Sequence, residues 1–288
     1  MNFTPLSFWD DVVSHLKIKE ISTLNNLDFN KPSDVFECVL LKRNDYKLYV
    51  RFGKETKKRI EVVLISADGS TMTDDNVVDF IEDRKYARLE RLFVWGPSRH
   101  LETSLGVNEQ KRVWKFTKGP AGSKKDAFLE IANFADGELT EYDVTKKFDN
   151  ITICNVVGNS SAVTEILLKS RETVRFIFER NSTFANDFYE CLLNLFCVSH
   201  EAIRISLGSR SEHILPLLKE IVKKFMEEEI NVQKEKSLAV LLNEQQVLAM
   251  RSCVRFDDKG KCELVVGRLK MLIKIERSGL TVRVKLMD

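Results

Sequence analysis

The chain has 288 residues, of which 43% are hydrophobic and 31% are charged, and its 45 basic and 43 acidic side chains leave a net charge of +2. This composition is typical of a globular protein that buries a substantial core. The balanced charge and the lack of a long basic run argue against nucleic acid as a partner. No segment reaches the roughly 18 to 20 apolar residues that cross a bilayer, which argues against a membrane protein.

The N-terminus and the cysteines both favour an intracellular protein. Residues 1–5 lack the basic start and the apolar run of a signal peptide. The cysteines are scattered and form no C-x-x-C pair, which predicts buried free thiols in a reducing compartment. They are Cys38, Cys154, Cys191, Cys197, Cys253 and Cys262. We therefore expect a cytoplasmic location, with a nuclear one as the alternative.

The first elements that the pattern predicts are two amphipathic helices between residues 6 and 27. Trp9 falls on the same helical face as Val12, Val13 and Leu16. The segment has a distinctive order of residues. Two adjacent aliphatic residues are followed by a leucine, then by an acidic residue with an aliphatic one beside it, and then by a further leucine. These positions are Val12, Val13, Leu16, Glu20, Ile21 and Leu24.

This order resembles the first half of an F-box, the helical module that binds the Skp-type adaptor of cullin-RING ubiquitin ligases. The resemblance implies that the six residues contact the adaptor, as apolar helix faces do in a groove. The second half, which normally carries a valine-serine pair and a tryptophan, is missing, because residues 28–32 read Asp-Phe-Asn-Lys-Pro. The segment is therefore similar to a truncated, divergent F-box. The alternative is a helical hairpin packed on the rest of the chain.

Alternating apolar residues follow Asp258-Lys259-Gly260 near the end of the chain. With this ending, the chain after the F-box-like segment is similar to nematode-type F-box proteins, in which an F-box-associated domain of mixed α/β structure follows a short F-box. The resemblance implies a truncated F-box-like segment over residues 1–32 and an α/β interaction domain over residues 33–288. Within that domain we expect the sub-regions 33–148, 149–230 and 231–288.

Residues 33–148 predict a mixed sheet with helices. Alternating apolar residues predict strands at 35–41, 46–52 and 59–65, joined as an antiparallel meander. A helix over 75–84 and strands at 91–95 and 112–116 follow. Ser123, three residues before Asp126, is typical of a capped helix start. Phe128, Ile131 and Phe134 would form the buried stripe of that helix.

Residues 149–230 show the most regular pattern. Strand cores at 151–153, 174–176 and 203–205 each precede an amphipathic helix. This alternation predicts parallel strands with crossover helices, and its period is close to that of leucine-rich repeats. The leucine and asparagine ladder of such repeats is absent, so the units are degenerate.

The last sub-region predicts an antiparallel end to an α/β, or mixed α+β, fold. Strands are expected at 253–256, 262–266, 271–275 and 280–284, with turn residues at 257–260 and 277–279.

A candidate surface for binding a target protein lies on the predicted parallel strands. Thr152, Arg175 and Arg204 each stand between two apolar residues, and we expect them to align about 5 Å apart. Arginine recognises carboxylates at interfaces. The alternative is that the arginines pair with Glu172 or Glu201.

No motif for catalysis, a metal or a cofactor is visible. The histidines (His15, His100, His200 and His213) have no metal-ligand spacing, and no phosphate-binding or nucleophile motif occurs. We expect a non-catalytic substrate receptor of a Skp–cullin–F-box ubiquitin ligase, with the adaptor and an unknown target protein as partners. One alternative is a stand-alone protein-interaction module without ligase binding. The other is an enzyme whose site is built from dispersed residues.

Overall fold

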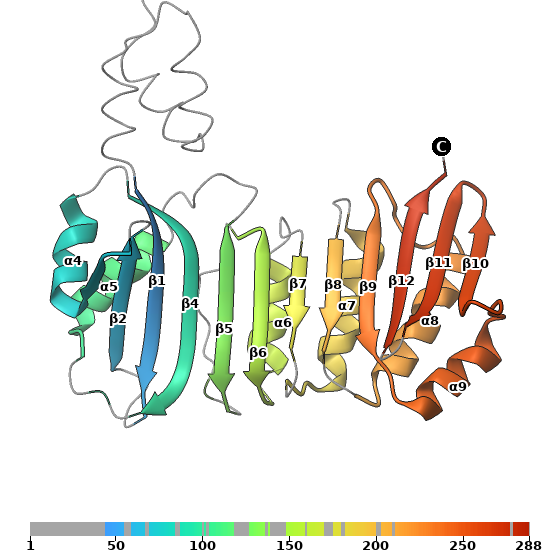
Figure 1. Cartoon of the computed structure of the whole chain (residues 1–288), viewed down its shortest axis with the longest axis horizontal. Helices are drawn as coiled ribbons and strands as arrows, with labels where there is room; N and C mark the ends of the chain where they lie inside the picture. The colour runs from blue at the N-terminus through green and yellow to red at the C-terminus, as the bar shows by residue number, and fades with distance from the viewer. Residues whose placement is uncertain are drawn as a thin grey trace, which may run out of the picture. The chain divides into compact units, whose positions relative to one another are not determined.

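A computed structural model of the chain shows a mixed α/β protein (Figure 1). It describes residues 44–54, 59–66, 69–83, 87–99, 101, 104–117, 127–135, 138, 148–158, 160–169, 175–179, 182–199, 203–208, 211–276 and 279–287. The described residues form two compact units, one up to Leu129 and one from Glu130 onward. The predicted mixed α/β class, the strand–helix units and the antiparallel strands at the C-terminal end are confirmed.

The first unit is a small sheet with two helices. Its strands are β1 (Asn44–Gly53), β2 (Ile60–Ser66), β3 (Thr71–Thr73) and β4 (Ala87–Arg99), in the order β3-β2-β1-β4. Its helices are α4 (Asp74–Asp83) and α5 (Val107–Thr117). The β1–β2 pair is antiparallel, as predicted, and β1 runs parallel to β4. Alternate residues of β1, such as Leu48 and Val50, are buried, and the ring of Tyr46 packs on Phe80 of α4.

The prediction of a strand at 112–116 was wrong, because these residues belong to α5. A five-residue alternation is too short to fix a period. The start of the helix carries the missed signal, since the Glu109 carboxylate accepts a hydrogen bond from the backbone N–H of Gly106. An acid that reaches back to an N-terminal backbone donor is one half of a capping box.

The predicted helix with Phe128, Ile131 and Phe134 on its buried stripe was also wrong, because this segment is strand β5 (Phe128–Phe134). Asn133 has a φ of 63°, and this left-handed residue interrupts the alternation between Ile131 and Phe134. Ile131 and Phe134 are both buried although they are three positions apart, whereas buried residues in a regular strand are two positions apart. That spacing imitates a helix in the sequence.

The second unit contains a sheet in which sequence order and spatial order agree over four strands. These are β6 (Asn150–Val156), β7 (Arg175–Phe178), β8 (Ile203–Leu207) and β9 (Lys236–Leu241), and each runs parallel to the next. The strand cores predicted at 151–153, 174–176 and 203–205 are thus confirmed over their described residues. Strand β9 was missed, because its first residue, Lys236, reads as part of a charged stretch.

Helices connect these parallel strands on one face of the sheet. They are α6 (Ser160–Lys169), α7 (Asn186–Val198) and α8 (Ile214–Met226). Figure 1 shows them behind the strands, whereas no described helix lies in front of this part of the sheet. The sheet face toward the helices is apolar and buried, with residues such as Phe176, Ile205 and Leu238. Phe188 of α7 packs against the rings of Phe178 and Phe184.

Lys236 is a buried charge with a structural role at the start of β9. Its side chain is 0% exposed, and its Nζ donates hydrogen bonds to the carbonyl oxygens of Phe196 (2.6 Å) and Cys197 (3.2 Å). Both carbonyls lie in the last turn of α7, where helix carbonyls lack partners and a positive charge is favourable. Burial lowers the pKa of Lys236 to about 8, and the nearby Cys197 thiolate acts in the opposite direction.

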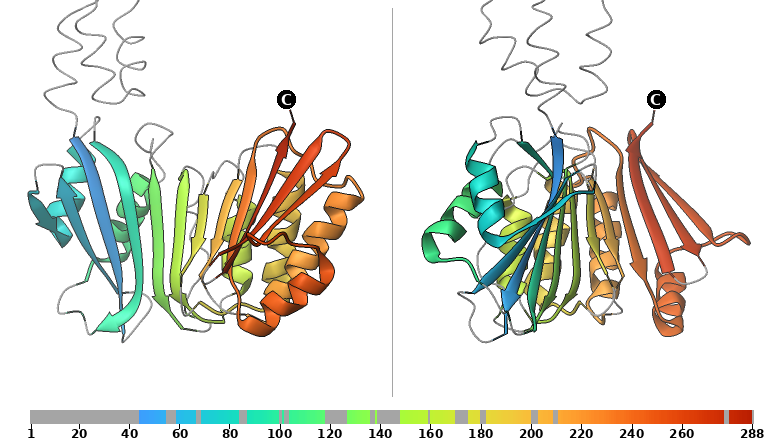
Figure 2. Two further views of the ribbon diagram at one scale, coloured as in Figure 1. Left: turned by 45° about the vertical axis from the view of Figure 1, so that its right-hand side comes forward. Right: turned by 60° about the vertical axis from the view of Figure 1, so that its left-hand side comes forward.

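The C-terminal strands form the predicted antiparallel meander. They are β10 (Lys261–Val266), β11 (Leu269–Glu276) and β12 (Gly279–Leu286), and β12 joins them to the edge of β9. In the left-hand view of Figure 2 these red strands stand in front of the orange helices α8 and α9 (Glu244–Cys253).

The strand predicted at 253–256 was wrong, because Cys253 ends α9 and residues 254–256 are not in a strand. Helix α9 buries few residues, among them Gln246 and Met250, so its apolar periodicity is weak. Its capping box was readable: the Asn243 side chain accepts from the Gln246 backbone N–H at 2.8 Å, and the Gln246 side chain accepts from the Asn243 N–H at 3.0 Å.

The predicted boundaries of the F-box-like segment, the α/β domain and its sub-regions stay a prediction. None of the described helices has the length and apolarity of a membrane span. Of the cysteines that the structure describes, none forms a disulfide, and Cys197 and Cys262 are buried as predicted. Cys253 is exposed, which corrects the prediction for that residue.

Candidate functional site

The predicted adaptor-binding residues lie outside the described part of the chain. Val12, Val13, Leu16, Glu20, Ile21 and Leu24 all precede β1, so their role stays a prediction. Glu172 and Glu201, the alternative partners of the predicted arginines, also fall outside the described residues.

The predicted target-binding residues lie on the sheet face that points away from α6, α7 and α8, which we call the open face. Residues on this face alternate with the buried residues of each strand. Arg175 and Arg204 are exposed and stand directly side by side, because their Cα atoms are partners in the β7–β8 pairing. The prediction that these two arginines align is confirmed.

Thr152 does not belong to this row, which corrects the prediction. In the β6–β7 pairing Thr152 stands opposite Ile177, whereas Asn150 stands opposite Arg175. Thr152 and Arg175 each lie between two apolar residues in the sequence, but in the sheet Thr152 lies two residues away from the position opposite Arg175. Thr152 is also only 5% exposed, so it offers little surface to a partner.

A third arginine joins the row from the antiparallel strands. Ser237 of β9 pairs with Arg204 on one side and with Arg283 of β12 on the other. We call Arg175, Arg204 and Arg283 the arginine row. Arg283 shows the same signal in the sequence, an arginine between Val282 and Val284. Its place in the row was not readable, since the pairing of β12 with β9 brings together segments far apart in the chain.

Within the described part of the chain, no acid compensates the positive charge of the arginine row. No ion pair joins these three side chains to any carboxylate that the structure describes. The lysines on β11 differ, because Lys270 pairs with Glu263 at 2.6 Å and Lys274 with Glu276 at 3.2 Å. Neighbouring arginines repel each other, so an anionic partner would be favoured here.

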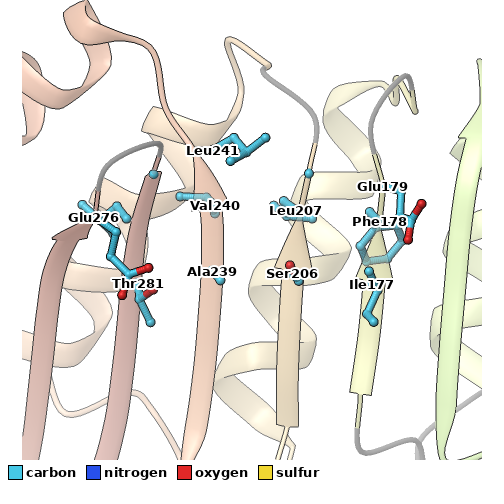
Figure 3. Close-up of a pocket in the computed structure, with 13 residues that line it drawn as sticks. Ile177, Phe178, Glu179, Ser206, Leu207, Ala239, Val240, Leu241, Glu276 and Thr281 are labelled. Carbon is cyan, nitrogen blue, oxygen red and sulfur yellow. The ribbon is translucent and has the colours of Figure 1, made fainter.

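Next to the arginine row, toward the carboxyl ends of the parallel strands, the open face has a shallow trough of about 410 Å³ (Figure 3). Its middle row consists of the side chains of Ile177, Ser206, Ala239 and Thr281. Three of these are small, which is why the surface is hollowed. In the next row Gly279 is the register partner of Leu241, and Gly208, which follows β8, also lines the trough. The trough can therefore take an apolar side chain.

Acidic residues stand at the far end of the trough. Glu179 follows β7 and Glu276 ends β11, and both line the trough. Burial raises the pKa of the Cys154 thiol in β6 to about 11, with smaller contributions from the carboxylates of Glu130 and Glu179. The open face is thus basic at the amino ends of the parallel strands, whereas at their carboxyl ends Glu179 adds an acid and Glu276 pairs with Lys274.

The described residues offer no group of three His, Cys, Asp or Glu side chains that could hold a metal ion. His213 is the one histidine among them. It lies 5.2 Å from the Tyr189 ring and 3.8 Å from the Glu212 carboxylate, which indicates a packing role. The open face itself combines arginines, small residues and acids, and this combination suits binding.

Comparison with protein-family models, curated proteins and solved structures gives no match to this chain.

Proposed function

We propose that this chain is a non-catalytic protein-binding receptor that presents a target protein to a Skp–cullin–F-box ubiquitin ligase. The observation that supports target binding is the open face, where an arginine row without described carboxylate partners borders a trough. Protein interfaces are enriched in arginine, and apolar side chains of a partner anchor in such hollows.

In this proposal the N-terminal segment binds the adaptor through Val12, Val13, Leu16, Glu20, Ile21 and Leu24. The support is the order of aliphatic and acidic residues in the sequence. Ubiquitin transfer is performed by the partner proteins, which matches the absence of a catalytic motif in the sequence. A cytoplasmic or nuclear location goes with this function.

Adaptor binding is tested by co-expressing the full-length chain with a Skp-type adaptor and purifying the complex. Leu16→Asp places a charge on the proposed apolar contact and should abolish co-purification. Lys17→Asp, at the neighbouring polar position, is the matched control and should still co-purify. If the wild-type chain does not bind the adaptor, the ligase role is wrong.

Target binding is tested with the same full-length chain by proximity labelling in cells. The double variant Arg175→Glu and Arg204→Glu reverses the charge of the row and should lose a set of labelled proteins that the wild type and Leu16→Asp both retain. This double variant should still bind the adaptor. If the wild type and the double variant label the same proteins, the open face is not the target-binding surface.

A further inference from the structure

On the open face, the residues of β9 lie between two arginines of the neighbouring strands. Ser237 and Ala239 are small and half-exposed, and they form a low strip between β8 and β12. The register places Arg204 on one side of Ser237 and Arg283 on the other. We call these two residues the arginine clamp. Neighbouring strands lie about 4.8 Å apart, so a group above Ser237 is within reach of both guanidinium groups.

Two residues further along β9, at Ala239, the neighbours of the strip are small residues and no longer arginines. Ala239 pairs with Ser206 on one side and with Thr281 on the other, and all three line the trough. Two residues of a strand span about 6.6 Å. The distance along β9 from the arginine clamp to the trough therefore equals the distance between alternate side chains of an extended peptide.

We propose that the open face binds an extended segment of the target protein that carries an acidic residue and, two positions away, an aliphatic residue. The segment lies along β9. The anionic side chain sits above Ser237 and accepts hydrogen bonds from the arginine clamp. The aliphatic side chain fills the trough above Ala239, and the residue between them points away from the sheet. This inference rests on the proposed function, since it names the class of target that the open face recognises.

Charge and shape together favour this occupant over others. The arginine clamp has no described carboxylate partner, and arginine binds carboxylates and phosphates in a bidentate manner. The trough is too shallow to enclose a small molecule, because one side lies open to solvent, but it accommodates a single aliphatic side chain. Glu179 at the far end of the trough disfavours a uniformly anionic ligand such as nucleic acid or an acidic membrane.

The test uses the purified full-length chain and fluorescein-labelled twelve-residue peptides, with binding followed by fluorescence anisotropy. The probe is a Gly-Ser peptide with a central Glu-Ser-Leu. Three controls are a Gln-Ser-Leu peptide, a Glu-Ser-Ser peptide and a peptide in which Glu and Leu are adjacent. A phosphoserine-Ser-Leu peptide distinguishes a phosphate from a carboxylate as the anion.

We expect the Glu-Ser-Leu or the phosphoserine peptide to bind at least fivefold more tightly than all three controls. Tighter binding of the phosphoserine peptide identifies phosphate as the preferred anion and supports the same site. Equal binding of the Glu and Gln peptides, or no binding of either anionic peptide at 1 mM, overturns the inference.

Variants of the chain locate the binding. Arg204→Gln and Arg283→Gln should each weaken the anionic peptide about tenfold, as expected for losing a charged hydrogen bond. Arg175→Gln is the matched control, because Arg175 lies one strand outside the arginine clamp and should change the affinity less than threefold. Ala239→Leu fills the trough and should weaken the peptide while the circular dichroism spectrum stays unchanged. Equal effects of the three arginine variants would show non-specific charge attraction and overturn the inference.

Failure of this inference and failure of the proposed function are distinguishable. If the peptides do not bind but the adaptor still co-purifies and target labelling depends on the arginine row, the receptor stands and its ligand class is wrong. If the adaptor does not co-purify but the peptides bind as expected, the ligase role is wrong and the peptide site stands.

Discussion

The buried Lys236 makes the stability of the protein depend on pH in a way that one substitution can isolate. Its ammonium group caps the C-terminal turn of α7 and is 0% exposed, and burial lowers its pKa from 10.5 to about 8. Since the folded pKa lies below the unfolded one, the unfolded chain binds more protons between about pH 8 and 10.5. The free energy of unfolding therefore rises with pH across this window.

The size of the effect follows from the shift. One pKa unit corresponds to about 1.4 kcal/mol, so the full window is worth at most about 3 to 4 kcal/mol. Between pH 7 and pH 9 the expected gain is about 1 kcal/mol. The thiols act in the opposite direction, because burial raises the pKa of Cys197 and of Cys154 to about 11. Their contribution lowers stability above about pH 9. The contribution of Cys154 is common to the wild type and a lysine variant, whereas the charge of Lys236 lowers the pKa of Cys197 and is lost in the variant.

The assay is urea unfolding followed by circular dichroism at pH 7, 8 and 9 for the wild type and Lys236→Met. Methionine keeps the length of the side chain and removes the charge. The wild-type free energy of unfolding should rise relative to that of the variant by about 1 kcal/mol from pH 7 to pH 9. Lys274→Met is the control, because Lys274 is exposed and pairs with Glu276 at 3.2 Å, and its difference should stay constant. A constant difference for Lys236→Met as well would refute the reasoning.

Three further predictions concern the second unit. Phe188→Ala should cost about 3 to 5 kcal/mol in urea unfolding, because it leaves a cavity among packed rings, whereas Leu248→Ala, at a residue 66% exposed, should change stability by less than about 0.5 kcal/mol. Asn243→Ala should cost about 1 kcal/mol through loss of the α9 cap, and Gln245→Ala, at an exposed position of α9, should cost less; equal costs would argue against the cap. Iodoacetamide should modify the exposed Cys253 before the other four described cysteines, as mapped by mass spectrometry, and earlier labelling of a buried thiol would contradict the structure.

The sequence predicted those parts of the fold in which one local period persists. The strands β7 and β8 and the helix α8 were found because apolar residues keep a period of two or of 3.6 over their whole length. Strand β5 was missed because left-handed Asn133 changes the period inside it. Strand β9 was missed because its first residue, Lys236, is charged. The hydrogen bond that Lys236 donates to the end of α7 and that allows its burial forms only in the folded chain.

The candidate site was predicted in part for a similar reason. The alignment of Arg175 with Arg204 could be predicted, because each arginine has the same place in the alternation of its strand and the two strands pair in that register. Thr152 fails because the register between β6 and β7 is set by packing and not by the position of a residue within its own strand. Arg283 and the trough depend on β12 pairing with β9, a long-range contact that carries no local signal.

The one-sided winding of β6 to β9 has a consequence for how such a protein can change over evolution. Each crossover helix packs on the same face, so an additional strand–helix unit would lengthen the sheet by about 4.8 Å and leave the opposite face uncovered. Duplication or loss of a unit would widen or narrow the exposed surface without a new core. Substitutions at alternate positions, such as Ser206 or Ser237, could then alter that surface while the buried positions beside them stay constant.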